Sequence, residues 1–77
     1  MNLQEFTKAF EEIVMVEEGT VQLTTELSSL DDWDSLSRAS LLSVFEESFQ
    51  LKVEESIVRN AATFQDIIDI VKDKLES

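Results

Sequence analysis

The sequence has no cysteine, no histidine and no proline, and only one glycine among its 77 residues. A chain without cysteine or histidine forms no disulfide, has no thiol nucleophile or imidazole base, and lacks the ligands of most structural zinc sites. Basic residues are also few, since 6 Lys and Arg stand against 17 Asp and Glu, for a formal net charge of −11. We therefore expect no enzyme activity from the chain itself, no nucleic-acid binding, and partners with basic surfaces.

Long apolar runs are missing too. No stretch approaches the roughly 18 consecutive apolar residues that suggest a membrane span, and the first residues lack the basic start and apolar run of a signal peptide. We expect no membrane insertion and a cytoplasmic location. A chain of this length buries roughly 60% of its unfolded surface, enough for one modest core. We therefore predict a single domain over residues 1–77, monomeric and of marginal stability.

Apolar residues at helical spacing first appear from Leu3 to Val16. Polar residues fill the opposite face, and Gly19 predicts a cap that ends this helix near residue 18. The segment 20–33 fits neither a helical nor a strand period, so it predicts a long loop pinned by its own apolar residues. The polar residues assigned to the outer face of the first helix are Glu5, Lys8, Glu11 and Glu12.

Three further helices are predicted after this loop. Asp34 is an N-cap for a helix over 35–50, whose apolar stripe includes Leu36, Ala39, Leu42, Phe45 and Phe49. A short helix is predicted within 53–60, and a last one begins at Thr63, with Asp66 as its capping partner. The predicted fold class is therefore all-α: a small four-helix bundle of three longer helices and one short helix.

Ser35 follows the predicted N-cap at the first turn of the second helix. Backbone N–H groups and the helix dipole at such a position favour an attached phosphate. The chain has no histidine, and no lysine lies near Ser35 in the sequence, so it offers no base to activate the hydroxyl. Any reaction at Ser35 would need a base from a partner enzyme.

The triplet Asp34-Ser35-Leu36 resembles the modification site of the acyl carrier protein family, and its surroundings extend the resemblance over essentially the whole chain. The supporting segments are Leu30 and Trp33 before it, then Leu41-Leu42, Phe45-Glu46-Glu47, Phe49, Leu51-Lys52-Val53 and Thr63-Phe64-Gln65-Asp66-Ile67-Ile68. The resemblance implies that Ser35 is esterified with 4′-phosphopantetheine from coenzyme A, whose thiol holds acyl or aminoacyl groups as thioesters. The implied partners are a phosphopantetheinyl transferase, an acyl- or aminoacyl-loading ligase, and downstream transferases or synthases.

The front of the second helix departs from the family pattern. Acidic side chains are usual there, but this chain has Ser37, Arg38, Ser40 and Ser43. Electrostatic steering of partners should therefore be weaker than the net charge suggests, which favours a specialised carrier serving a dedicated pathway. The residues expected to recognise partners are Asp34, Leu36, Arg38, Ser40, Ser43, Glu46 and Glu47.

The aromatic and apolar residues allow two interpretations. At helical spacing the five phenylalanines predict the core. The resemblance adds the hypothesis that Leu41, Val44, Phe45 and Ile57 border an acyl pocket, which bulky Phe45 would shorten in favour of a short, polar or aminoacyl cargo. Trp33 either covers the end of the bundle or shields the base of the pantetheine arm.

An alternative of a different class stays open. An acidic helical adaptor or inhibitor could bind basic protein surfaces without covalent change, and Ser35 would then be dispensable. The acids around Asp32 do not form an EF-hand, because Ser37 stands where that loop needs glycine and Ser43 where it needs glutamate. We predict no catalytic residue and no dedicated metal site.

Overall fold

The computed structural model describes residues 1–75 and contains four α-helices and one short 3₁₀ helix. They are α1 (Leu3–Ile13), the 3₁₀ helix η1 (Leu27–Ser29), α2 (Ser35–Phe49), α3 (Glu55–Arg59) and α4 (Phe64–Val71). Residues 1–75 contain no β-strand, only an isolated antiparallel bridge between Glu26 and Thr63. The predicted fold class, a small all-α bundle, is confirmed.

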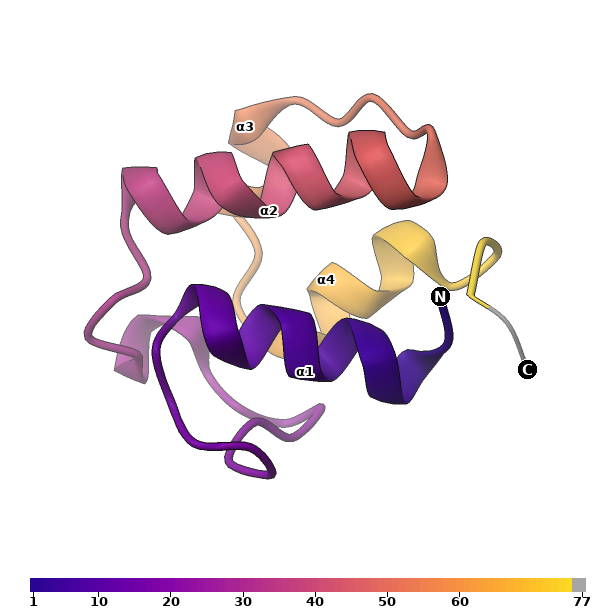
Figure 1. Ribbon diagram of the computed structural model, residues 1–77. Helices are drawn as coiled ribbons and strands as arrows, with labels where there is room; N and C mark the ends of the chain where they lie inside the picture. The colour runs from indigo at the N-terminus through magenta and orange to yellow at the C-terminus, as the bar shows by residue number, and fades with distance from the viewer. Residues whose placement is uncertain (76–77) are drawn as a thin grey trace.

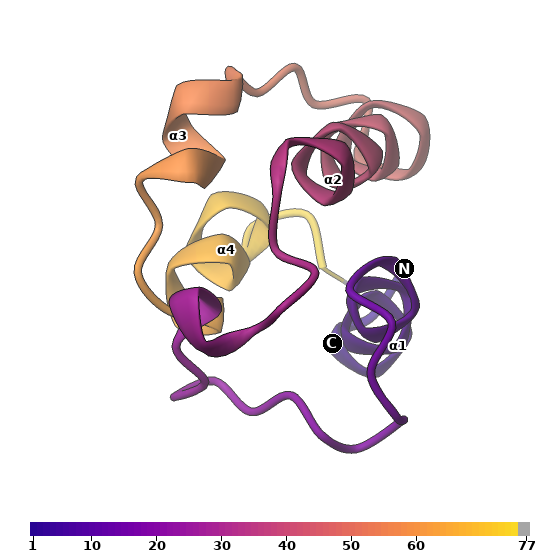
Figure 2. The ribbon, with the colours of Figure 1, turned by 90° about the vertical axis from the view of Figure 1, so that its left-hand side faces the viewer.

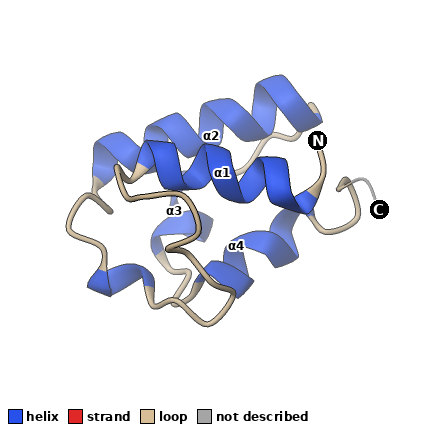
Figure 3. Cartoon of the chain, turned by 60° about the horizontal axis from the view of Figure 1, so that its bottom comes forward, coloured by secondary structure: helices blue, strands red, loops and turns tan. Residues whose placement is uncertain are grey.

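The four α-helices surround a single core. Figure 1 shows α1 and α2 side by side and running in opposite directions, and these two helices contact each other. In the end-on view of Figure 2, α3 lies beside α2 and α4 lies across from α1. The long connection from α1 to α2 passes along the side of the bundle near the start of α4 (Figures 2 and 3).

Phenylalanine rings join the three longer helices at the centre of the core. Phe6 of α1 is fully buried, with its ring centroid 6.0 Å from that of Phe45 in α2 and 6.1 Å from that of Phe64 in α4. Phe49 contacts the same ring edge-on at 5.7 Å, and Phe10 lies 4.7 Å from Phe64. All five phenylalanines are buried, as their spacing predicts, and stacked or edge-on contacts stabilise such a cluster beyond its buried area.

The end of α1 differs from its prediction. The helix ends at Ile13, and the left-handed residue that caps it is Met15, at φ 58°, whereas Gly19, at φ 89°, lies further along in the loop. The N–H of Val16 donates to the carbonyl of Glu11 and that of Met15 to the carbonyl of Glu12, which is a Schellman cap. The apolar pattern extends beyond Ile13 because Val14 and Val16 pack on the core from the turn that follows the helix.

The sequence pattern places Glu11 on the outer face of α1, and this prediction is wrong. Its side chain is only 2% exposed, and its carboxylate accepts hydrogen bonds from the backbone N–H groups of Gly19 and Val21, both at 2.9 Å. The carboxylate therefore fixes the start of the long loop. Val21 and Leu27 are buried further along it and pin the loop as predicted, whereas Leu23 is 40% exposed and the short helix η1 interrupts the segment.

The buried stripe of α2 is shifted from the predicted one. Ser37, Leu41, Phe45 and Phe49 face the core at intervals of four residues. Leu36 and Ala39, which the apolar spacing places on the buried stripe, are exposed. One residue is about 100° around an α-helix, so this small change of register turns Leu36 out to solvent.

Loop carbonyls satisfy the first backbone N–H groups of α4. The N–H of Phe64 donates to the carbonyl of Thr25 at 3.0 Å, and that of Gln65 to the carbonyl of Leu23 at 2.9 Å. The carboxylate of Asp66 accepts the N–H groups of Ala62 and Thr63, as predicted for the capping partner. These bonds fix the loop before α2 and thereby the place where α2 begins.

Candidate functional site

The candidate site lies at the start of α2, where Asp34 and Ser37 cap the helix reciprocally. The Asp34 carboxylate accepts the N–H of Ser37 at 3.0 Å, and the Ser37 hydroxyl accepts the N–H of Asp34 at 2.8 Å. The Ser37 hydroxyl also donates to the carbonyl of Asp34 at 3.0 Å. Ser37, although counted with the front of the helix in the sequence, is therefore a buried structural residue.

These bonds hold Asp34 in its charged form. The pKa of the Asp34 carboxyl is lowered chiefly because the backbone N–H of Ser37 donates to it. Desolvation acts in the opposite direction, whereas the Leu36 backbone, the Ser37 hydroxyl and the charge of Arg38 lower the pKa further. A negative charge thus lies directly before Ser35 at neutral pH.

Ser35 and Leu36, the two residues after the cap, both face solvent. Because Ser37 takes the capping role, the Ser35 hydroxyl has no hydrogen-bond partner within residues 1–75. The Leu36 side chain is 78% exposed, so the interpretation of Leu36 as an ordinary core residue is wrong. An accessible hydroxyl and an exposed apolar side chain therefore lie next to each other at a helix N-terminus.

The exposed face of α2 continues from Leu36 along the helix. Ser40, Ser43 and Glu47 follow Leu36 at intervals of three or four residues, and they share its face. Glu46 is exposed beside them. The structure thus brings six of the seven predicted recognition residues to the start or the outer face of this helix.

Arg38 is the exception among the predicted recognition residues. Its side chain is 16% exposed, and its Nε donates to the Glu55 carboxylate at 2.8 Å, which joins α2 to α3. Its guanidinium also lies 5.8 Å from the centroid of the Trp33 ring, within the range of a cation–π contact. Arg38 is therefore bound within the protein rather than presented on the outer face of α2.

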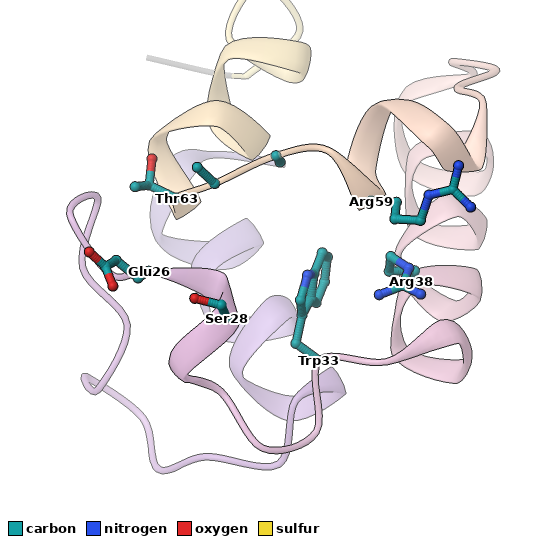
Figure 4. Close-up of a pocket in the computed structure, with 8 residues that line it drawn as sticks. Glu26, Ser28, Trp33, Arg38, Arg59 and Thr63 are labelled. Carbon is teal, nitrogen blue, oxygen red and sulfur yellow. The ribbon is translucent and has the colours of Figure 1, made fainter.

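Trp33 lies at the end of the bundle, as one interpretation of the sequence expects. Its ring is half-buried and its centroid lies 5.6 Å from that of Phe10. Trp33 also lines a surface pocket of about 650 Å³, which Figure 4 shows in close-up. The residues that line this pocket are Glu26, Ser28, Trp33, Arg38, Arg59, Ala61, Ala62 and Thr63.

A second pocket opens on the other side of the α2 start. It has a volume of about 220 Å³, and its lining combines the exposed side chains of Met15 and Leu36 with the carboxylates of Asp32 and Asp34. Ile13, Ser37 and Ser40 complete this lining. The surface next to Ser35 is thus acidic and apolar at once, a combination that suits a basic partner with an apolar side chain to insert.

The hypothetical acyl pocket of Leu41, Val44, Phe45 and Ile57 does not coincide with the pockets described above. Leu41 and Phe45 are fully buried core residues, and Ile57 is 50% exposed. Within residues 1–75 no group of three or more acidic side chains is placed to hold a metal ion. None of the described helices is long and apolar enough to cross a bilayer.

The sequence did not reveal Arg59 or Met15 as neighbours of the site. Both contribute through pockets formed by residues far apart in the chain, so no local motif signals them. Comparison with family models, curated proteins and solved structures finds no match to this chain.

Proposed function

We propose that the chain is an acyl carrier protein, in which Ser35 bears 4′-phosphopantetheine and the terminal thiol of that group holds acyl or aminoacyl intermediates as thioesters. The observation that supports this most directly is the exposure of Ser35. Its hydroxyl is not used by the helix cap and lies between a charged Asp34 and an exposed Leu36. The protein is not itself an enzyme but a substrate for partner enzymes.

The modification is a phosphoryl transfer. The Ser35 oxygen attacks the phosphorus that carries pantetheine in coenzyme A, a new O–P bond forms, and the pyrophosphate bond breaks to release adenosine 3′,5′-bisphosphate. The hydroxyl proton passes to a base of the transferase, since the chain has no histidine to accept it. Once attached, the phosphate lies at the N-terminus of α2, where the helix dipole stabilises an anion.

The surface around Ser35 supports docking of a basic partner. The net charge of −11 attracts positively charged proteins over a distance, and Asp32 and Asp34 provide charge beside the serine. Leu36 and Met15, 78% and 77% exposed respectively, add apolar area to the same pocket as these acids. We propose that the transferase, the loading ligase and downstream transferases or synthases use this surface, with Ser40, Ser43, Glu46 and Glu47 extending it.

The uncharged serines of the outer α2 face support a dedicated pathway. A general fatty-acid synthase would meet Ser40 and Ser43 where carboxylates are usual in the family, so its docking should be weaker. The cargo and a cytoplasmic location stay predictions. Equal chain extension on this protein and on the synthase's own carrier would contradict the dedicated role.

An acidic adaptor is the second candidate, favoured by the same charge and by the exposed Leu36. It differs from the carrier in one respect, because it needs the surface but not the Ser35 hydroxyl.

Intact mass after incubation with coenzyme A, magnesium and a promiscuous phosphopantetheinyl transferase distinguishes the carrier from the adaptor. We expect one phosphopantetheine adduct on the wild type and on Ser40→Ala, an exposed serine on the same helix, and none on Ser35→Ala. No adduct on well-folded wild type with more than one transferase would reject the carrier and leave the adaptor.

A further inference from the structure

Sulfur occurs at two positions of the chain, Met1 and Met15, because the sequence has no cysteine. Met1 is half-buried and packs against the core, whereas the Met15 side chain is 77% exposed. Thioethers are common targets of peroxides, and in this chain no thiol competes for the oxidant. Met15 therefore carries the readily oxidised sulfur of this protein.

The backbone of Met15 is unusual for its residue type. Its φ of 58° lies in the left-handed region, where a Cβ crowds the following carbonyl and where glycine is the usual residue after a helix. The one glycine of the chain stands four residues further on, so the end of α1 carries the steric cost of a methionine. Backbone strain of this kind clusters at functional sites. The strain points to a use for the Met15 side chain.

Met15 lies beside the proposed attachment point. Figure 1 shows the end of α1 and the start of α2 at the same end of the bundle. Met15 and Leu36 both line the pocket of about 220 Å³ that also contains Asp32 and Asp34. A methionine side chain is flexible and polarizable, so it adapts its shape to an apolar partner surface. The strained turn thus adds an adaptable apolar contact next to Ser35.

We infer that Met15 is a modification site, at which a hydroperoxide converts the thioether to a sulfoxide and thereby weakens docking of partner enzymes at Ser35. The inference rests on the proposed function. The sulfur attacks one peroxide oxygen, an S–O bond forms and the O–O bond breaks. The proton of the transferred oxygen passes to the leaving oxygen, which departs as water or an alcohol. The sulfur loses two electrons and the peroxide gains them.

The physical effect is confined to the docking surface. A sulfoxide oxygen is hydrated, so burying it against an apolar partner costs desolvation free energy. The hydrogen bonds of the cap use backbone atoms of Met15 and Val16, which the reaction leaves unchanged. Asp32 and Asp34 keep their charges, so the loss of docking should persist when salt screens the electrostatic attraction.

The test uses the full chain without phosphopantetheine, treated with a low concentration of hydrogen peroxide. Intact mass and peptide mapping locate the added oxygen, which we expect on Met15 before Met1. The rate of phosphopantetheine addition should then fall about three- to tenfold, as for the loss of one partly buried apolar contact. The KM for the protein should rise while kcat stays the same, and methionine sulfoxide reductases should restore the rate.

Three variants separate the thioether from other oxidation products. Met15→Leu keeps an apolar side chain without sulfur, so it should react near the wild-type rate before and after peroxide. Met15→Gln has a polar side chain and should react slowly without any peroxide. Leu3→Gln makes a matched change at a 42% exposed side chain at the opposite end of α1, and it should keep the wild-type rate.

Equal rates for oxidised and untreated wild type, or a peroxide effect that persists in Met15→Leu, would overturn the inference while the adduct on Ser35 upholds the carrier. Faster oxidation of Met1, or a large fall of the urea midpoint on oxidation, would overturn it too. Failure of the untreated protein to accept phosphopantetheine from more than one transferase would reject the carrier, and the regulation of its docking with it.

Discussion

The starts of α2 and α4 have the same capping pattern in the sequence but differ in exposure to solvent. Each helix begins with a polar residue followed three positions later by a second polar side chain, Asp34 with Ser37 and Thr63 with Asp66. At α4 the next residue, Phe64, is 1% exposed, and its N–H donates to a loop carbonyl. At α2 the next residue, Ser35, is exposed. The same capping chemistry thus buries one helix end in the core and leaves the other open to solvent.

Phe64→Ala should give the largest effect, because it removes the ring that anchors the start of α4 in the core. We expect a loss of about 3–5 kcal/mol in the free energy of unfolding, measured by urea titration with circular dichroism. A domain of this size has little stability to spare, so the milder Phe64→Leu supplies a readable value if the alanine variant does not fold. A loss below about 1 kcal/mol in the free energy of unfolding would contradict the conclusion that Phe64 anchors the start of α4 in the core.

Glu11→Ala tests how the loop that reaches α4 is held at its other end. The change leaves the N–H groups of Gly19 and Val21 without their acceptor, so we expect a loss of about 1.5–3 kcal/mol in unfolding free energy. Glu12→Ala is the matched control, since Glu12 is exposed on the next position of α1. Equal effects of the two substitutions would count against a structural role of the buried carboxylate.

Asp66→Ala tests the cap of α4 directly. It removes the acceptor of the Ala62 and Thr63 N–H groups, and we expect about 0.5–2 kcal/mol of destabilisation by the same titration. Asp73→Ala deletes an equal charge beyond the last turn of α4 and should have a smaller effect, or raise stability by reducing self-repulsion. An equal loss of unfolding free energy in Asp73→Ala would contradict a specific capping role for Asp66.

Asp34→Asn tests the start of α2 through the pH dependence of stability. Asparagine can still cap a helix, but its side chain does not titrate. The pKa of Asp34 is lowered on folding, so its stabilising contribution is complete above the unfolded pKa, about 3.9, and is lost as the pH falls through the lower folded pKa. We expect urea midpoints measured from pH 7 to pH 3 to fall less steeply in Asp34→Asn. Asp32→Asn serves as the control, and an unchanged profile in Asp34→Asn would contradict the assignment.

Ser35→Ala and Leu36→Ala should have the smallest effects on folding. Both side chains are exposed, so each substitution should change the unfolding free energy by no more than about 0.5 kcal/mol. Leu36→Ala should nevertheless slow modification of Ser35 by a transferase, which the rate of adduct formation measures. A large loss of stability in either variant would show that the α2 start is as structural as the α4 start.

Local patterns predicted the helices well and their ends unevenly. The starts at Asp34 and Thr63 could be read from capping residues, because a cap is a contact between neighbours in the chain. The end of α1 could not, because Val14 and Val16 keep the apolar pattern after the helix has stopped. The buried face of α2 was predicted wrongly at Leu36 for a related reason. Apolar residues lie on several sides of this helix, so their spacing alone does not identify the side that is buried.

The sequence by itself determined the helical class, the acidity, the absence of histidine and cysteine, and the position of Ser35 at a helix start, because all of these depend on composition or on residues close together in the chain. Only the tertiary structure decided that Glu11 is buried, that Leu36 faces solvent, and that Arg38 and Arg59 share a pocket with Trp33. Those facts depend on how segments distant in sequence pack, and packing selects one face of each helix for the core.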